Sequence, residues 1–125
     1  MEMRSKCPIA CSLDLFGDKW TLLVLRDILF MEKTRFEQFL DSPEKIATNI
    51  LTDRLHKLEK AGLVSKAPYG NHKLRMAYTA TEKGESLKPV IKEIVKWGLN
   101  NIEGTAARRP PSMAAGAESA AEATS

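Results

Sequence analysis

Apolar residues recur at helical spacing between Pro8 and Phe16, and Gly17 ends that pattern. Asp18 is expected to cap a second helix over residues 19–30, which is apolar on nearly every side. The pattern therefore predicts a short first helix and then a buried central helix.

Two further helices are predicted next. Thr34 is expected to cap a short one that ends at Ser42-Pro43, because the residue before a proline disfavours helix. A longer helix is predicted from about Ala47 to Ala61, with Gly62 in the position that follows a helix end.

The pattern then changes to strands. Residues 63–67 and 75–79 predict two strands, joined by a hairpin loop over 68–73. Thr81 is expected to cap a long last helix that reaches about Asn101 and is kinked by Pro89 inside it. The fold class predicted is mainly α with a small β-hairpin, arranged as a winged helix-turn-helix.

Length and composition predict one domain in the 125-residue chain. We expect an N-terminal extension over residues 1–6, a winged helix-turn-helix domain over 7–104, and a disordered tail rich in Ala, Pro and Ser over 105–125.

The net charge of +3 is concentrated in the middle of the chain. Residues 33–75 hold nine Lys and Arg against five Asp and Glu, whereas the flanking segments are close to neutral. A nucleic-acid footprint is therefore expected in this segment.

The fourth predicted helix has two faces. Ala47, Leu51, Leu55 and Leu58 form an apolar stripe, with short polar side chains opposite. Asn and Thr side chains suit the reading of base edges, and helices approach DNA with their first residues. The alternative is that the first residues only cap the helix and the polar face is merely solvated. The candidate base-reading residues are Thr48, Asn49, Thr52, Asp53, Arg54 and His56.

Arg54 points toward the apolar side of that helix, so either a phosphate or an acidic neighbour is expected to pair with it. Phosphate contacts from a basic wing and from the flanks of the helix would position the protein without specifying sequence. The candidates for these contacts are Arg35, Lys45, Asn71, His72, Lys73 and Arg75.

Other classes of function find little support in the sequence. No catalytic triad, phosphate-binding loop, cofactor motif or metal-ligand cluster is evident. The longest apolar run is far shorter than a membrane span, and the start lacks a secretory signal, so a cytoplasmic protein without a membrane partner is expected. The competing interpretation is a winged helix that binds protein or RNA.

The sequence resembles the HxlR-type winged helix-turn-helix regulators, relatives of the MarR group, over nearly the whole domain. The segments that carry the resemblance are CPIA at residues 7–10, GDKWTLLVLR at 17–26, RFEQF at 35–39, IATNILTDRL at 46–55, LEKAGLV at 58–64 and TEKG at 81–84, with Tyr78 and Trp97-Gly98. Residues 41–45 depart from it, since relatives often have a glycine-containing turn there.

The resemblance implies a transcriptional regulator, with double-stranded DNA as its partner, that binds inverted-repeat operators as a homodimer. The first and last helices would form the interface, and the apolar candidates for it are Ile9, Leu13, Val90, Ile94 and Trp97.

The resemblance also implies an oxidant or small-molecule effector, because some members sense through a thiol at the position of Cys7. A helix N-terminus and Lys6 both favour a thiolate there. The alternative is an inert, half-buried cysteine near the dimer interface.

Overall fold

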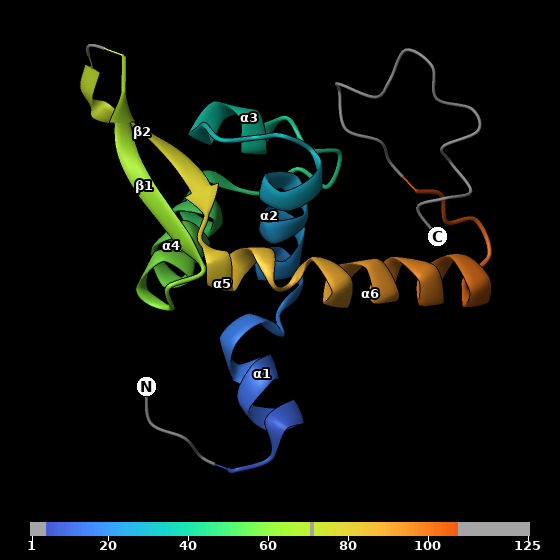
Figure 1. The fold of residues 1–125 in the computed structure, drawn as a ribbon. Helices are drawn as coiled ribbons and strands as arrows, with labels where there is room; N and C mark the ends of the chain where they lie inside the picture. Colours follow the sequence, from blue (N-terminus) through green and yellow to red (C-terminus); the bar gives the residue numbers. More distant parts are fainter. Residues whose placement is uncertain (1–4, 71, 108–125) are drawn as a thin grey trace.

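The computed structural model describes residues 5–70 and 72–107. It confirms a mainly helical fold with one antiparallel hairpin (Figure 1). The elements are α1 (Pro8–Phe16), α2 (Lys19–Phe30), α3 (Phe36–Leu40), α4 (Thr48–Lys60), β1 (Val64–Tyr69), β2 (His72–Ala80), α5 (Glu82–Glu85) and α6 (Lys88–Asn101).

The core lies around α2, which packs against α4, the hairpin and α6. Phe39 of α3 is buried there, with its ring edge-on to Tyr78 of β2 at 6.4 Å between centroids. The prediction of a buried central helix is therefore confirmed. The fully buried core residues include Val24, Leu25, Phe39, Leu51, Leu55, Leu58 and Val64.

The starts of α2 and α5 and the end of α4 follow from local capping chemistry. The Asp18 carboxylate accepts from the backbone N–H groups of Trp20 and Thr21, and the Thr81 hydroxyl accepts from that of Gly84. Gly62 has φ +78°, the left-handed conformation in which glycine commonly follows a helix. These predictions are confirmed.

The prediction that Thr34 caps α3 is wrong, because Arg35 occupies that position. The Thr34 carbonyl accepts from the backbone N–H of Tyr78 at 2.7 Å, which draws Thr34 to the edge of the hairpin. The Gln38 side chain accepts instead from the backbone N–H groups of Thr34 and Arg35, at 2.9 and 3.0 Å.

The single kinked helix predicted after Thr81 is also wrong, because the chain forms two helices, α5 and α6. Pro89 lies in the first turn of α6, where its missing N–H costs no hydrogen bond. The proline therefore starts a new helix after a break at Ser86 and Leu87.

The hairpin is longer than predicted, because its strands pair from Val64 with Ala80 up to Tyr69 with His72. The predicted loop over 68–73 shrinks to a tight turn at Gly70, where φ is +62°. Asn71 lies outside the described residues, as do the side chains of residues 72–74. An additional bridge joins Arg35 to Ala77, so the start of α3 is bound to β2.

Helix α1 projects away from the body of the molecule (Figure 1). It has no buried residue, although Phe16 at its end packs against the core. Within the part of the chain that the structure describes, no helix is both long and apolar enough to cross a bilayer. Residues 108–125, most of the tail predicted to be disordered, lie outside the described residues.

Candidate nucleic-acid interface

The first turn of α4 presents short polar side chains to solvent. Thr48, Asn49 and Thr52 are all exposed, and the Thr52 hydroxyl donates back to the Thr48 carbonyl at 2.9 Å. Ala47 is the N-cap residue, so the prediction that Thr48 and Asn49 cap the helix is wrong, and a polar face that is merely solvated stays the alternative. Ala47 is also exposed, although it was predicted to be in the core. It precedes the first residue of α4, so helical periodicity does not determine the direction of its side chain.

Further along α4, Asp53 and His56 are exposed on the same polar face, whereas Arg54 is half-buried. The Arg54 Nε atom donates to both oxygens of Asp18 at 3.1 Å, and its Nη1 atom donates to Asp53 at 2.5 Å. The guanidinium thus ties α4 to the start of α2, which favours the acidic-neighbour interpretation of Arg54 over a phosphate contact.

The contact with Arg54 also affects the pKa of Asp18. Partial burial alone would raise the pKa of Asp18, but hydrogen bonds from Thr21 and Arg54, together with the charge of Arg54, lower it overall. The carboxylate is therefore held in its charged form by two helices at once.

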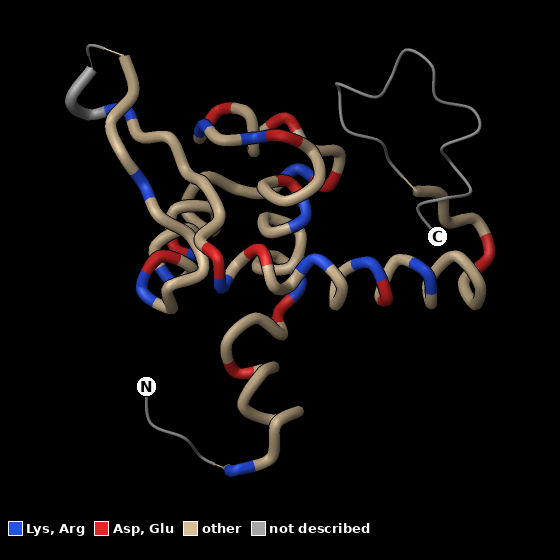
Figure 2. The backbone as a smooth tube through the Cα atoms, viewed as in Figure 1, with Lys and Arg blue, Asp and Glu red and all other residues tan. Residues whose placement is uncertain are grey.

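The hairpin beside α4 is basic. Lys66 on β1 and Arg75 on β2 are exposed, and neither strand contains an acidic residue (Figure 2). Lys66 also pairs with Glu59 of α4 at 3.5 Å, and β1 packs directly on α4. Short polar side chains and basic ones thus lie on adjoining elements.

Arg35 brings a further positive charge to the hairpin. Its guanidinium lies over the Tyr69 ring, 5.5 Å from the centroid, and the Arg35 backbone bridges to β2. Tyr69 was not predicted to lie beside Arg35, because no local pattern links residues 34 positions apart. Lys45, in the loop before α4, is exposed at φ +60°.

Two apolar surfaces lie away from α4. On α1, Ile9 is 70% exposed, and on α6 Trp97 is 62% exposed. Leu13, Val90, Ile94 and Ile102 are also exposed, so every predicted interface residue is uncovered in the single chain.

Cys7 is the N-cap of α1 and is exposed rather than half-buried. Cys11 is partly buried, and its thiol donates to the Ser5 carbonyl at 3.0 Å. The two sulfurs are not joined by a disulfide.

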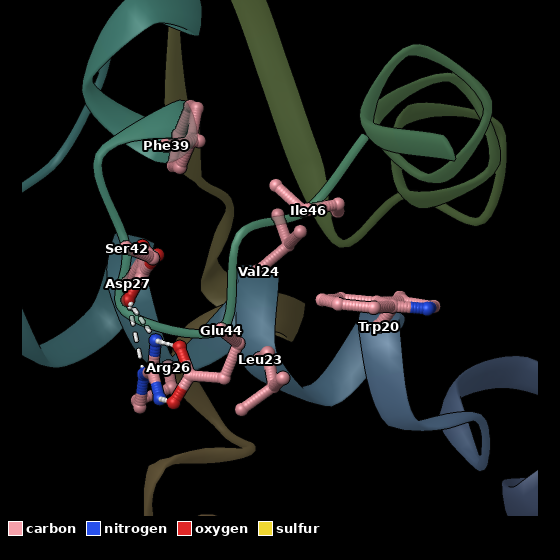
Figure 3. A pocket seen from close by; sticks show the side chains of 9 residues that line it. All are labelled: Trp20, Leu23, Val24, Arg26, Asp27, Phe39, Ser42, Glu44 and Ile46. Carbon is pink, nitrogen blue, oxygen red and sulfur yellow. Dashed lines mark hydrogen bonds and ion pairs between the residues drawn. The ribbon is translucent and has the colours of Figure 1, made fainter. Parts of the chain in front are cut away.

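A hollow between α2 and the loop over residues 42–46 is too small for an effector (Figure 3). It has room for about one water molecule. Its lining residues are Trp20, Leu23, Val24, Arg26, Asp27, Phe39, Ser42, Glu44 and Ile46.

The family model for the HxlR-like helix-turn-helix matches residues 15–106, which include α2 to α6 and the hairpin. The chain belongs to the HxlR-like helix-turn-helix family. Its relatives include an uncharacterized HTH-type transcriptional regulator of Synechocystis sp., 36% identical over 97 residues that cover 78% of this chain and 71% of the relative. YdeP of Bacillus subtilis, another HTH-type regulator, is 34% identical over 92 residues, covering 74% and 71%.

Solved structures resemble this HxlR-like chain over most of its length. The redox regulator HypR, in its reduced form, superposes with a TM-score of 0.69 and 28% identity, covering 78% of this chain and 95% of HypR. The reduced form of the transcriptional regulator YodB of Bacillus subtilis gives 0.63 and 26%, covering 81% and 99%. The protein is thus a transcriptional regulator with a winged helix-turn-helix fold.

Proposed function

We propose that this HxlR-like protein is a repressor that binds an inverted-repeat operator as a homodimer. In this model α4 enters the major groove and the hairpin lies along the adjacent backbone or minor groove. The observation that carries the proposal is the exposed first turn of α4, with Thr48, Asn49 and Thr52, on a helix that packs against a hairpin with no acidic residue in its strands.

The roles differ between the two elements. Asn49 and Thr52 have the donors, acceptors and methyl group that distinguish base pairs in the major groove. Lys45, Lys73, Arg75 and Arg35 supply positive charge, which attracts phosphates of any sequence. The proposal therefore separates residues that specify a sequence from residues that hold the duplex.

Two substitutions test this division. Asn49→Ala should cost about 1–3 kcal/mol on the preferred operator and relax sequence preference, because base contacts are lost. Lys73→Ala should weaken binding to all sequences alike and reduce the slope of log K against log salt by about one. Fluorescence anisotropy on an operator selected from random DNA, with random duplex for comparison, measures both effects. Identical behaviour of the two variants would contradict the assigned roles.

The competing function, a winged helix that binds a protein or RNA, gives different results in the same titration. Affinity of the wild type for duplex DNA should fall steeply as salt rises, since bound cations are released from the phosphates. An absence of sequence preference, or tighter binding to RNA than to duplex DNA, would favour that alternative.

The exposed thiol of Cys7 supports a further proposal, oxidant control of DNA binding. HypR, one of the structural relatives, is a redox regulator, and Cys7 lies at the N-terminal end of α1, the helix that projects from the body of the molecule. Diamide should change operator affinity of the wild type but not of Cys7→Ser. Equal responses of the two proteins, each compared with and without diamide, would exclude a Cys7 switch.

A further inference from the structure

The loop that leads into α4 holds a backbone conformation that needs outside support. Lys45 has φ +60°, a left-handed conformation that disfavours residues with a Cβ atom. Its backbone N–H donates to the Ser42 carbonyl at 3.0 Å, which closes a tight turn two residues before the N-cap Ala47. The direction in which α4 leaves this loop therefore depends on what holds Ser42 to Lys45 in place.

That support comes from α2 (Figure 3). The Arg26 guanidinium donates to both oxygens of Glu44, at 2.8 and 2.9 Å, and its Nε atom donates to Asp27 at 2.9 Å. Such a two-pronged pair fixes orientation as well as distance. Glu44 is thereby attached to the outer side of α2.

A second attachment lies deeper. The Ser42 hydroxyl donates to the Asp27 carboxylate, and Lys33 Nζ donates to Ser42 Oγ at 2.8 Å and lies 3.7 Å from Asp27. Asp27 and Ser42 are only 3% and 4% exposed. We call this set of five residues, Arg26, Asp27, Lys33, Ser42 and Glu44, the loop clamp.

A largely buried ionic network is a poor means of gaining stability, because desolvation of the charges offsets their attraction. It is a good means of fixing one geometry, since every donor and acceptor has a defined direction. The clamp attaches the loop to α2 at Ser42 and at Glu44, and α4 begins four residues after Glu44.

We propose that the loop clamp sets the approach of α4 to DNA, with Glu44 and Ser42 as positioning residues for sequence discrimination. This inference rests on the proposed function, because it assigns to the clamp an effect on base readout. Neither residue contacts DNA in this scheme. Both act through the orientation of the first turn of α4.

Glu44→Gln tests the proposal, with Glu103→Gln as a control that removes the same charge from an exposed site after α6. Loss of a negative charge alone strengthens binding to any DNA. Misalignment of α4 should instead lower the ratio of operator to random-DNA affinity by about tenfold, comparable to the loss of one base contact. We expect the lower ratio for Glu44→Gln and an unchanged ratio for Glu103→Gln.

Amide hydrogen exchange of the free protein provides a second readout. Glu44→Gln should speed exchange at Lys45 and Leu51, whose N–H groups bond to Ser42 and Ala47, and leave the hairpin unchanged. Ser42→Ala, which breaks the deeper attachment, should act in the same direction and replaces Glu44→Gln if that variant fails to fold.

The outcomes separate the two proposals. A wild type that selects no sequence from random DNA would refute the proposed function. The exchange experiment would still test whether the clamp restrains the loop and the first turn of α4, because it uses the free protein. Unchanged exchange, or an unchanged affinity ratio in a wild type that does discriminate, would overturn the clamp proposal alone.

Discussion

The Asp18 carboxylate joins two helices through hydrogen bonds of different kinds. It caps α2 by accepting from backbone N–H groups, and it accepts from Arg54 Nε on α4. The cap was predictable from sequence, because its partners lie two and three residues away. The partner of Arg54 was not, because Asp18 is 36 residues distant and a helical wheel gives only the direction of a side chain.

The lowered pKa of Asp18 predicts a specific loss of stability in acid. As pH falls, the unfolded chain takes up this proton at a higher pH than the folded chain does. The stabilisation is therefore complete above the unfolded pKa, about 3.9, and is lost as the pH falls through the lower folded value. Asp18→Asn keeps a capping side chain but removes the charge, so its stability should decline less with acid.

Urea denaturation of both proteins between about pH 6 and pH 2 measures this difference, since the unfolded pKa lies inside that window. The wild type should be the more stable at neutral pH, and the two curves should converge in acid. Curves that remain parallel throughout would show that the Asp18 charge contributes nothing.

At the scale of elements, the junction between α4 and α5 is unusually tight. A Cβ atom added at Gly84 would lie 2.1 Å from the Leu63 backbone carbonyl oxygen. The same region holds the end of α4, because Thr81 and Lys83 donate to the Gly62 and Ala61 carbonyls at 2.6 and 3.1 Å.

Gly84→Ala should therefore destabilise the protein by about 1–3 kcal/mol, because backbone atoms must move apart. Gly98→Ala on α6 is the matched control, since its added Cβ atom meets nothing within 4 Å among the described residues. Thermal unfolding of the two variants checks the prediction. A Gly84→Ala variant as stable as the control would contradict the close contact.

The order of elements was predictable from periodicity and caps, but their junctions were less so. Pro89 was predicted to kink one long helix, whereas it lies in the first turn of a second helix, because the local sequence does not show whether a helix bends at a proline or restarts there. The shift of the α3 cap from Thr34 to Arg35 depends on a hydrogen bond to Tyr78, which only the folded chain brings near.

At the scale of the whole molecule, apolar patterning identified the exposed faces of α1 and α6 without indicating what covers them. The single chain leaves Ile9 and Trp97 mostly exposed. The two sides of the proposed nucleic-acid interface were predicted individually, whereas the contact of Arg35 with Tyr69 and the loop clamp required the tertiary structure.

The proposed homodimer predicts that charge on these faces will separate the protomers. Trp97→Glu should shift the protein from dimer to monomer, because a carboxylate would be desolvated in an apolar interface. Lys92→Glu, an exposed substitution on α6, should leave the dimer intact and is the control. Sedimentation velocity measures both. A wild type that sediments as a monomer at all concentrations would refute the homodimer.

The isolation of α1 has a consequence for dilute protein. A helix of nine residues whose contact with the core is made by Phe16 at its end is only marginally stable in water. In the proposed dimer, folding of α1 would be coupled to dimerisation. The helical content would therefore rise with protein concentration. The folded fraction of α1 would then depend on the concentration of the regulator. Operator occupancy would rise over a narrower range of concentration than it would for protomers that bind independently.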